Sequence, residues 1–298
     1  MNYLMTGATG LIGRKLLEIL LARGDSVQYL GRRRNASLDA RAAFFSWTGE
    51  NLPSLNAMPR MDAVIHLAGE PVAQRWRPEV RKRIISSRVD GTRNLVSAIG
   101  ELKHKPSVLV SASAIGYYGD RSDEVLTETS SPGSDFLADL CVHWEREASR
   151  ARDFGLRVVP VRIAAVLSTA GGALAKMLPA FRLGLGSKLG NGRQWVSWIH
   201  LEDVAQMLLF AATAASLDTP LNGSSPNPIT NADFTRALAA AVHRPAVLAA
   251  PRLALRLALG QMSDVLFQSA RVLPAAAEGA GFRFEHPVLE EALSSLIR

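Results

Sequence analysis

Three glycines near the start of the chain have the spacing that a phosphorylated dinucleotide requires. Residues 6–13 read TGATGLIG, after a short apolar run and before an apolar-periodic segment that ends near Arg23. Gly7 permits a tight turn out of a strand, Gly10 lets the backbone approach a pyrophosphate, and Gly13 lets the helix pack on a sheet. The pyrophosphate would then lie at the helix N-terminus. The predicted cofactor contacts here are Gly7, Thr9, Gly10, Leu11, Ile12 and Gly13.

A run of arginines follows the second apolar segment, 26–30, which we expect to be the neighbouring parallel strand. An NAD site usually has an acid at the end of this strand for the ribose 2′-hydroxyl, whereas this chain has Gly31 followed by Arg32, Arg33 and Arg34. Nothing there repels a 2′-phosphate, and a guanidinium can bind one in bidentate fashion. We therefore predict NADP(H), with Arg32 and Arg33 as its contacts. The alternative is a solvated basic turn.

A polar loop at residues 70–77, EPVAQRWR, begins where the nicotinamide ring would lie. Its acid, amide, two guanidiniums and indole could hold a polar or phosphorylated substrate by bidentate pairing and stacking. We predict Glu70 and Trp76 as substrate contacts. The basic residues at 81–83 are more typical of a solvated helix face.

The elements that must position these residues alternate between short apolar runs and helical segments. This alternation is typical of a parallel sheet covered on both faces. Predicted strands are Tyr3–Met5, Val27–Leu30, Ala63–Leu67, Ser107–Ser111 and Arg157–Val161, and predicted helices are 10–23, 78–102 and 135–153. We therefore predict an α/β, Rossmann-type doubly wound parallel sheet with a smaller, mostly helical substrate lobe.

The alternation breaks at Ser168, where glycines and later prolines become frequent. We assign residues 1–168 and 201–224 to the NADP-binding domain. Residues 169–200 and 225–298 form the predicted substrate lobe, over the carboxyl ends of the strands where ligands bind in such folds.

Composition narrows the classes of partner. The chain has 298 residues, 48% hydrophobic and 20% charged, which suits a globular protein with a full core. A single cysteine and six histidines without metal-ligand spacing predict no metal. A net charge of +7 suits phosphate-bearing ligands, but no recognition motif favours nucleic acid. No apolar stretch predicts a membrane span, so we expect a cytoplasmic protein. We further expect a monomer or homodimer and a small-molecule substrate.

Four motifs are spread along the chain: the glycine segment at 7–13, HLAG at 66–69, VDGT at 89–92 and WIHLEDV at 198–204. Together they resemble the extended short-chain dehydrogenase/reductase superfamily. Within it the chain is most similar to epimerase-family proteins described as nucleotide-sugar epimerases. That likeness rests on SASAIGYYG at 111–119, FLADLC at 136–141 with Trp144 and Glu145, and a tail similar to their C-terminal domain of unknown function, LP at 273–274 and GFRF at 281–284.

The resemblance adds expectations about the cofactor. It implies contacts from Leu67, Ala68, Gly69 and Ser111. Trp47 stands where many relatives carry an aspartate for adenine, so its ring is expected over or beside that base, with core packing as the alternative.

The resemblance also implies a catalytic serine, a tyrosine, and a lysine four residues after that tyrosine. This chain keeps the serine as Ser113. Aligning the helix by Glu145 puts Leu137 and Cys141 at the other two positions, and neither can supply the proton transfer or the fixed charge.

Other residues could replace the missing pair. Tyr117 and Tyr118, in the loop after Ser113, are the predicted substitutes. A weaker candidate is His143 oriented by Asp139, one helical turn away. Cys141 is less suited to act as a nucleophile, since no base is evident beside it.

Two functions follow from these observations. One is an NADP(H)-dependent oxidoreductase or epimerase with an unusual active site, acting on a small or nucleotide-sugar-like carbonyl or hydroxyl substrate. The alternative is a catalytically silent NADP(H)-binding sensor or regulatory protein. The changes at Leu137 and Cys141 favour the second, while the polar loop and the substrate lobe favour the first.

Overall fold

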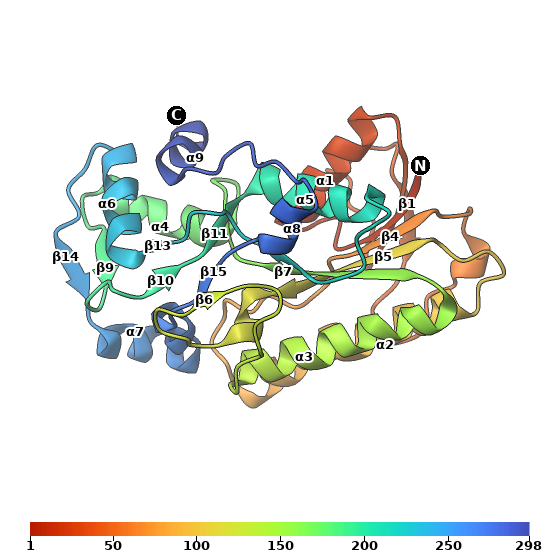
Figure 1. Cartoon of the computed structure of the whole chain (residues 1–298), viewed down its shortest axis with the longest axis horizontal. Coiled ribbons are helices and arrows are strands. Elements are labelled where there is room, and N and C mark those ends of the chain that lie inside the picture. The colour runs from red at the N-terminus through yellow and green to blue at the C-terminus, as the bar shows by residue number, and fades with distance from the viewer. Residues whose placement is uncertain (298) are drawn as a thin grey trace.

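The centre of the computed structural model, which describes residues 1–297, is a seven-stranded parallel sheet (Figure 1). From one edge to the other its strands are β12 (Leu221–Gly223), β7 (Arg157–Ile163), β5 (Val108–Ala114), β4 (Ala63–His66), β1 (Asn2–Thr6), β2 (Ser26–Gly31) and β3 (Ala43–Ser46). Every neighbouring pair is parallel. The order reverses between β1 and β4, which is the switch point where doubly wound sheets bind ligands. The predicted Rossmann-type α/β fold is confirmed.

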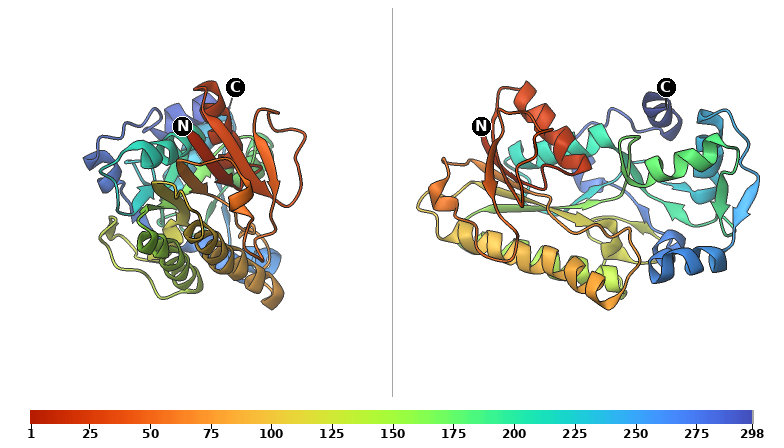
Figure 2. Two further views of the ribbon diagram at one scale, coloured as in Figure 1. Left: turned by 90° about the vertical axis from the view of Figure 1, so that its right-hand side faces the viewer. Right: turned by 180° about the vertical axis from the view of Figure 1, so that it is seen from behind.

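Helices cover both faces of this sheet (Figure 2). α1 (Leu11–Ala22) and α5 (Leu201–Thr213) lie on one face, and α2 (Pro78–Gly100) and α3 (Phe136–Ser149) lie on the other. A hydrophobic core lies on each face of the sheet. Alternate residues of a strand belong to opposite cores, because successive side chains point to opposite faces. Tyr3 and Met5 pack with Leu16 and Leu20 of α1, whereas Leu4 packs on the opposite face with residues of α2.

The remaining helices and strands build mainly the smaller lobe. Its core joins Leu174 and Leu178 of α4, Phe234 and Leu238 of α6, and Leu293 of α9. The helices are α4 (Gly172–Arg182), α6 (Asn231–Ala241), α7 (Arg252–Leu259), α8 (Ala275–Gly279) and α9 (Leu289–Leu296). The short strands are β6 (Val125–Leu126), β8 (Ala165–Leu167), β9 (Ser187–Leu189), β10 (Trp195–Val196), β11 (Trp198–His200), β13 (Ile229–Thr230), β14 (Leu248–Ala250) and β15 (Arg271–Val272).

These short strands form two-stranded sheets, while the helices supply most of the regular structure of this lobe. In addition, part of the C-terminal segment returns to the larger lobe. Ala277 of α8 and Phe282 are buried in the core beside α5, where Phe282 lies 5.4 Å from the ring centre of Phe210. The segment 275–284 therefore packs with the dinucleotide-binding sheet, although the sequence analysis places it in the lobe.

Within residues 1–297, no helix is long and apolar enough to cross a lipid bilayer. No group of three or more histidine, cysteine or acidic side chains in the same range could hold a metal ion.

Candidate functional site

A cleft of about 1,310 Å³ lies at the switch point between β1 and β4. The glycine turn at 7–10, the arginines 32–34, the loop after β4 and one side of α2 all border it. Of the predicted contacts, those that line the cleft are Gly7, Thr9, Gly10, Arg32, Arg33, Trp47, Leu67, Ala68, Gly69 and Glu70.

The three glycines are required for different reasons. Gly7 has φ +72°, and a Cβ there would lie 2.7 Å from the backbone carbonyl carbon of Leu67. A Cβ on Gly13 would lie 2.2 Å from the carbonyl oxygen of Gly7, so the helix can approach the turn only without a side chain. At Gly10 the contact is milder, 3.3 Å from that same oxygen. Gly10 also occupies the N-cap position of α1, where no side chain accepts a hydrogen bond from the helix. The first amides of α1 are therefore available for an anion.

A buried histidine holds the two strand ends together below the cleft. The Thr6 hydroxyl accepts hydrogen bonds from the amides of Leu67 and Ala68, both at 3.1 Å, and lies 2.7 Å from Nδ1 of His66. Because both lone pairs are used, this hydroxyl must donate to Nδ1, and Nε2–H then donates to Thr92 at 2.9 Å. Burial, with a smaller contribution from a nearby arginine, lowers the pKa of His66 to about 4, which keeps it neutral.

The three arginines predicted to favour NADP(H) are exposed at the other end of the cleft. Among the residues described, none of them has a carboxylate partner. Arg14 of α1, which was not among the predicted residues, donates to the carbonyl of Thr9 at 3.0 Å and to Ser37 at 2.8 Å. It thereby ties the glycine turn to the loop that carries the arginines.

Trp47 borders the cleft but is largely a core residue. It is 6% exposed, packs with Leu30 and Val64, and its indole N–H donates to the carbonyl of Asn51 at 2.7 Å. Of the two roles that the sequence left open for Trp47, core packing therefore accounts for most of the side chain. Trp47 also borders the cleft.

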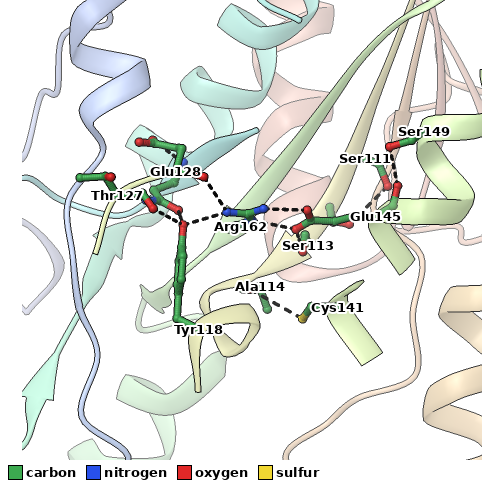
Figure 3. A network of polar contacts seen from close by, with 12 residues as sticks. Ser111, Ser113, Ala114, Tyr118, Thr127, Glu128, Cys141, Glu145, Ser149 and Arg162 are labelled. Atoms are coloured by element: carbon green, nitrogen blue, oxygen red, sulfur yellow. Dashed lines mark hydrogen bonds and ion pairs between the residues drawn. The ribbon is translucent and has the colours of Figure 1, made fainter. Parts of the chain in front are cut away.

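A charged network lies at the carboxyl ends of β5 and β7 (Figure 3). Ser113, on β5, donates its hydroxyl proton to Glu145 of α3 at 2.6 Å. Arg162, opposite Ser113 on β7, binds the same carboxylate in bidentate fashion with both distances at 2.9 Å. Both charged side chains are buried, with 4% of Arg162 and 12% of Glu145 exposed. Hydrogen bonding and charge from Glu145 outweigh burial, so the pKa of Arg162 is raised and the guanidinium is always protonated.

The two predicted tyrosines differ in their surroundings. Tyr118 is fully buried, and its hydroxyl lies 2.7 Å from Asn222 Oδ1 and 3.0 Å from a nitrogen of Arg162. Burial raises its pKa to about 12, partly opposed by Arg162. We therefore assign Tyr118 to the framework rather than to proton transfer. Tyr117 is partly exposed and lies under the Arg162 guanidinium, with the guanidinium carbon 3.5 Å from the ring centre, so it is the better candidate.

The positions of the missing tyrosine and lysine face inward but carry no suitable group. Leu137 packs on the turn after β5, where a Cβ on Gly116 would lie 3.2 Å from it. Cys141 is buried beside the carbonyl of Ala114, and burial raises the pKa of its thiol to about 12, which excludes a reactive thiolate at neutral pH. His143 and Asp139 lie exposed on the outer side of α3. The weaker candidates therefore lie outside the site.

The remaining predicted residues are placed as follows. Glu70 borders the cleft and accepts a 3.3 Å hydrogen bond from Gln74. Trp76 folds away, with its indole N–H donating to Val72 and its ring 5.2 Å from that of Phe136. Ser111 is buried within the sheet and does not border the cleft.

From the sequence, Glu145 was known only as part of a family motif and as the residue that aligns its helix, and Arg162 was not predicted. A signal was present, because an arginine inside the apolar strand VVPVRI needs a buried partner. The pairing itself requires knowing that α3 lies over β5 and β7.

A dinucleotide cleft at the switch point of a Rossmann-type sheet defines the class of protein. The chain matches the NAD dependent epimerase/dehydratase family over residues 3–222 and a domain of unknown function, DUF1731, over residues 250–296. The chain therefore belongs to the NAD dependent epimerase/dehydratase family, and the predicted resemblance, including its C-terminal domain, is confirmed.

Individual relatives extend this match over the whole chain. Epimerase family protein YfhF of Bacillus subtilis is 37% identical, covering 100% of this chain and 98% of the relative. The crystal structure of human epimerase family protein SDR39U1 (isoform2) with NADPH superposes with a TM-score of 0.90 at 32% identity, covering 100% of this chain and 99% of the human one. A nucleoside-diphosphate sugar epimerase from Corynebacterium glutamicum has a TM-score of 0.82 at 31% identity, covering 100% of this chain and 58% of that one. The NADPH in the human structure is the cofactor that the sequence predicts.

Proposed function

We propose that this protein binds NADP(H) in the cleft and uses it as an oxidoreductase or epimerase on a small or nucleotide-sugar-like substrate with a carbonyl or hydroxyl group. One observation carries the proposal. A single cleft joins an uncapped helix N-terminus, which suits a pyrophosphate, to three exposed arginines, which suit a 2′-phosphate. The NADPH in the human relative supports the cofactor, and the name of the bacterial relative supports the substrate class.

Bound NADP(H) would supply or accept a hydride, and this chain's own residues would handle the proton. Ser113 gives its only hydroxyl proton to Glu145, so it can accept a hydrogen bond from a substrate hydroxyl. A proton leaving that hydroxyl could pass through Ser113 to the Glu145 carboxylate. Arg162 holds the carboxylate in place and also positions the ring of Tyr117, whose phenol is a second route for the proton.

The cofactor proposal is tested by binding titrations with NADPH and NADH. Arg32→Ala and Arg33→Ala should each weaken NADPH binding by roughly tenfold or more and leave NADH binding nearly unchanged, because NADH lacks the 2′-phosphate. Lys176→Ala, which removes an exposed charge from α4 in the smaller lobe, is the matched control and should change neither. Equal affinity for both cofactors, unaffected by the arginine variants, would refute the NADP(H) proposal.

The alternative is a protein that binds NADP(H) and reports its state without turnover. The apolar Leu137 and the buried Cys141, at the positions that usually transfer the proton, favour it. The two functions differ in a screen of NADPH oxidation against a panel of carbonyl substrates. A catalyst should lose about 10²–10³ in rate with Ser113→Ala while retaining NADPH affinity. Tight NADPH binding without turnover across the panel would favour the sensor.

A further inference from the structure

Arg88 of α2 places a positive charge against Gly69, which borders the cleft, although Arg88 itself is not one of the lining residues. A Cβ built on Gly69 would lie 3.0 Å from the Arg88 guanidinium carbon and 3.1 Å from Nη2, so the absence of a side chain at Gly69 makes room for the guanidinium. Gly69 itself borders the cleft at the end of β4, next to Ala68. The guanidinium thus lies against the loop that follows β4, beside the cleft.

The guanidinium is held in place but is not neutralised. Its Nη1 donates to the carbonyl oxygens of Glu70 at 2.9 Å and Ile84 at 3.3 Å, and its carbon lies 5.1 Å from the ring centre of Trp144. Within residues 1–297, no carboxylate oxygen lies within ion-pair distance of Arg88. Burial lowers its pKa, with Cys141 and Glu70 acting in the opposite direction, but an arginine remains charged.

The same charge reaches the neighbourhood of Cys141 on α3. The guanidinium packs on Trp144, three residues after Cys141 on α3, and it acts to lower the pKa of the Cys141 thiol, although burial outweighs this effect. Cys141 has no fixed charge of its own. Arg83 and Arg93 of α2 also border the cleft, but each has a carboxylate partner, whereas Arg88 lies against Gly69 without one among residues 1–297.

We infer that Arg88 is the cation that binds the nicotinamide half of NADP(H), with its free nitrogens donating to the ribose hydroxyls of that half. Two observations support this assignment. Two backbone carbonyls and an indole face fix the guanidinium, and its Nη2 has no partner among the residues described. An unneutralised and positioned guanidinium is a donor that a polar ligand can use without rearrangement. The inference rests on the proposed cofactor site.

The test compares NADPH with 2′,5′-ADP, which carries the 2′-phosphate but lacks the nicotinamide half. Arg88→Met should weaken NADPH binding by tenfold or more and change 2′,5′-ADP binding less than twofold. Arg88→Lys keeps the positive charge but loses the two parallel N–H donors of the guanidinium, so its loss of NADPH affinity should be intermediate. Adding Cys141→Lys to Arg88→Met should recover part of the NADPH affinity, because it returns a cation to the same region from α3.

Lys82→Met, which removes an exposed charge from the same helix, should leave the ratio of the two affinities unchanged. Melting curves show whether Arg88→Met folds. If it does not, the ratio of NADPH to 2′,5′-ADP affinity in Arg88→Lys tests the inference. Equal weakening of both ligands, or an unchanged ratio in folded Arg88→Met and Arg88→Lys, would overturn the inference. Failure of the unaltered protein to bind 2′,5′-ADP would instead refute the proposed function, and the inference with it.

Discussion

The buried pair of Glu145 and Arg162 gives the most direct test of how this site is built. Glu145→Gln preserves the shape of the side chain and an oxygen for Ser113, but it leaves the Arg162 guanidinium without a counter-charge. Only 4% of that arginine side chain is exposed, so water cannot replace the lost partner. Breaking a buried pair in this way costs about 3–5 kcal/mol of folding free energy.

The change should appear in urea unfolding and as a fall in melting temperature of roughly 5–15 °C. Glu147→Gln is the matched control, because it is the same substitution two residues later on α3. The two arginine partners of Glu147 are 43% and 50% exposed, so its loss should cost less than about 1 kcal/mol.

Arg162→Met added to Glu145→Gln removes the uncompensated charge. The double variant should therefore be more stable than the sum of the two single effects predicts, with a coupling of about 2 kcal/mol or more. A loss from Glu145→Gln no larger than that from Glu147→Gln would refute the view that this pair is a buried, mutually dependent unit.

Three further results follow from the geometry. Gly13→Ala forces a Cβ to within 2.2 Å of a backbone oxygen and should cost about 3 kcal/mol in urea unfolding, whereas Gly279→Ala, which meets nothing within 4 Å, should cost almost nothing. Gly10→Ala has milder contacts within the protein, so it should fold nearly normally yet bind NADPH at least tenfold more weakly in a titration; unchanged affinity would contradict the assigned pyrophosphate position. His66 stays neutral in the folded protein down to about pH 4 but protonates near pH 6.5 when unfolded, so stability should fall as the pH drops between those values, by up to about 1.4 kcal/mol per pH unit from this residue. Unfolding curves of His66→Gln should show a smaller slope in that window, and an equal slope would assign the effect to other groups.

Much of the fold can be predicted from local sequence patterns. All five predicted strands are present in the central sheet, because apolar runs of that length bounded by turns are typical of strands buried on both faces. The strands β3 and β12, at the two edges of the sheet, were not among the predicted strands. Of these, β12 shows most clearly what pairing decides. It is only three residues long, it contains the buried polar Asn222, and it is a strand because β7 pairs with it. The return of residues 275–284 to the larger lobe likewise depends on contacts with α5 and β12 that no local pattern records.

The candidate site divides in the same way. The glycine spacing and the arginines after β2 lie within 34 residues and are contiguous with the elements that position them, so the cofactor could be predicted from local sequence alone. The pairing of Ser113, Glu145 and Arg162, the burial of Tyr118 and the approach of Arg88 to Gly69 were decided only by the tertiary structure. These contacts join different elements across the sheet, and the pKa and availability of each group depend on burial and charge supplied by neighbours distant in sequence.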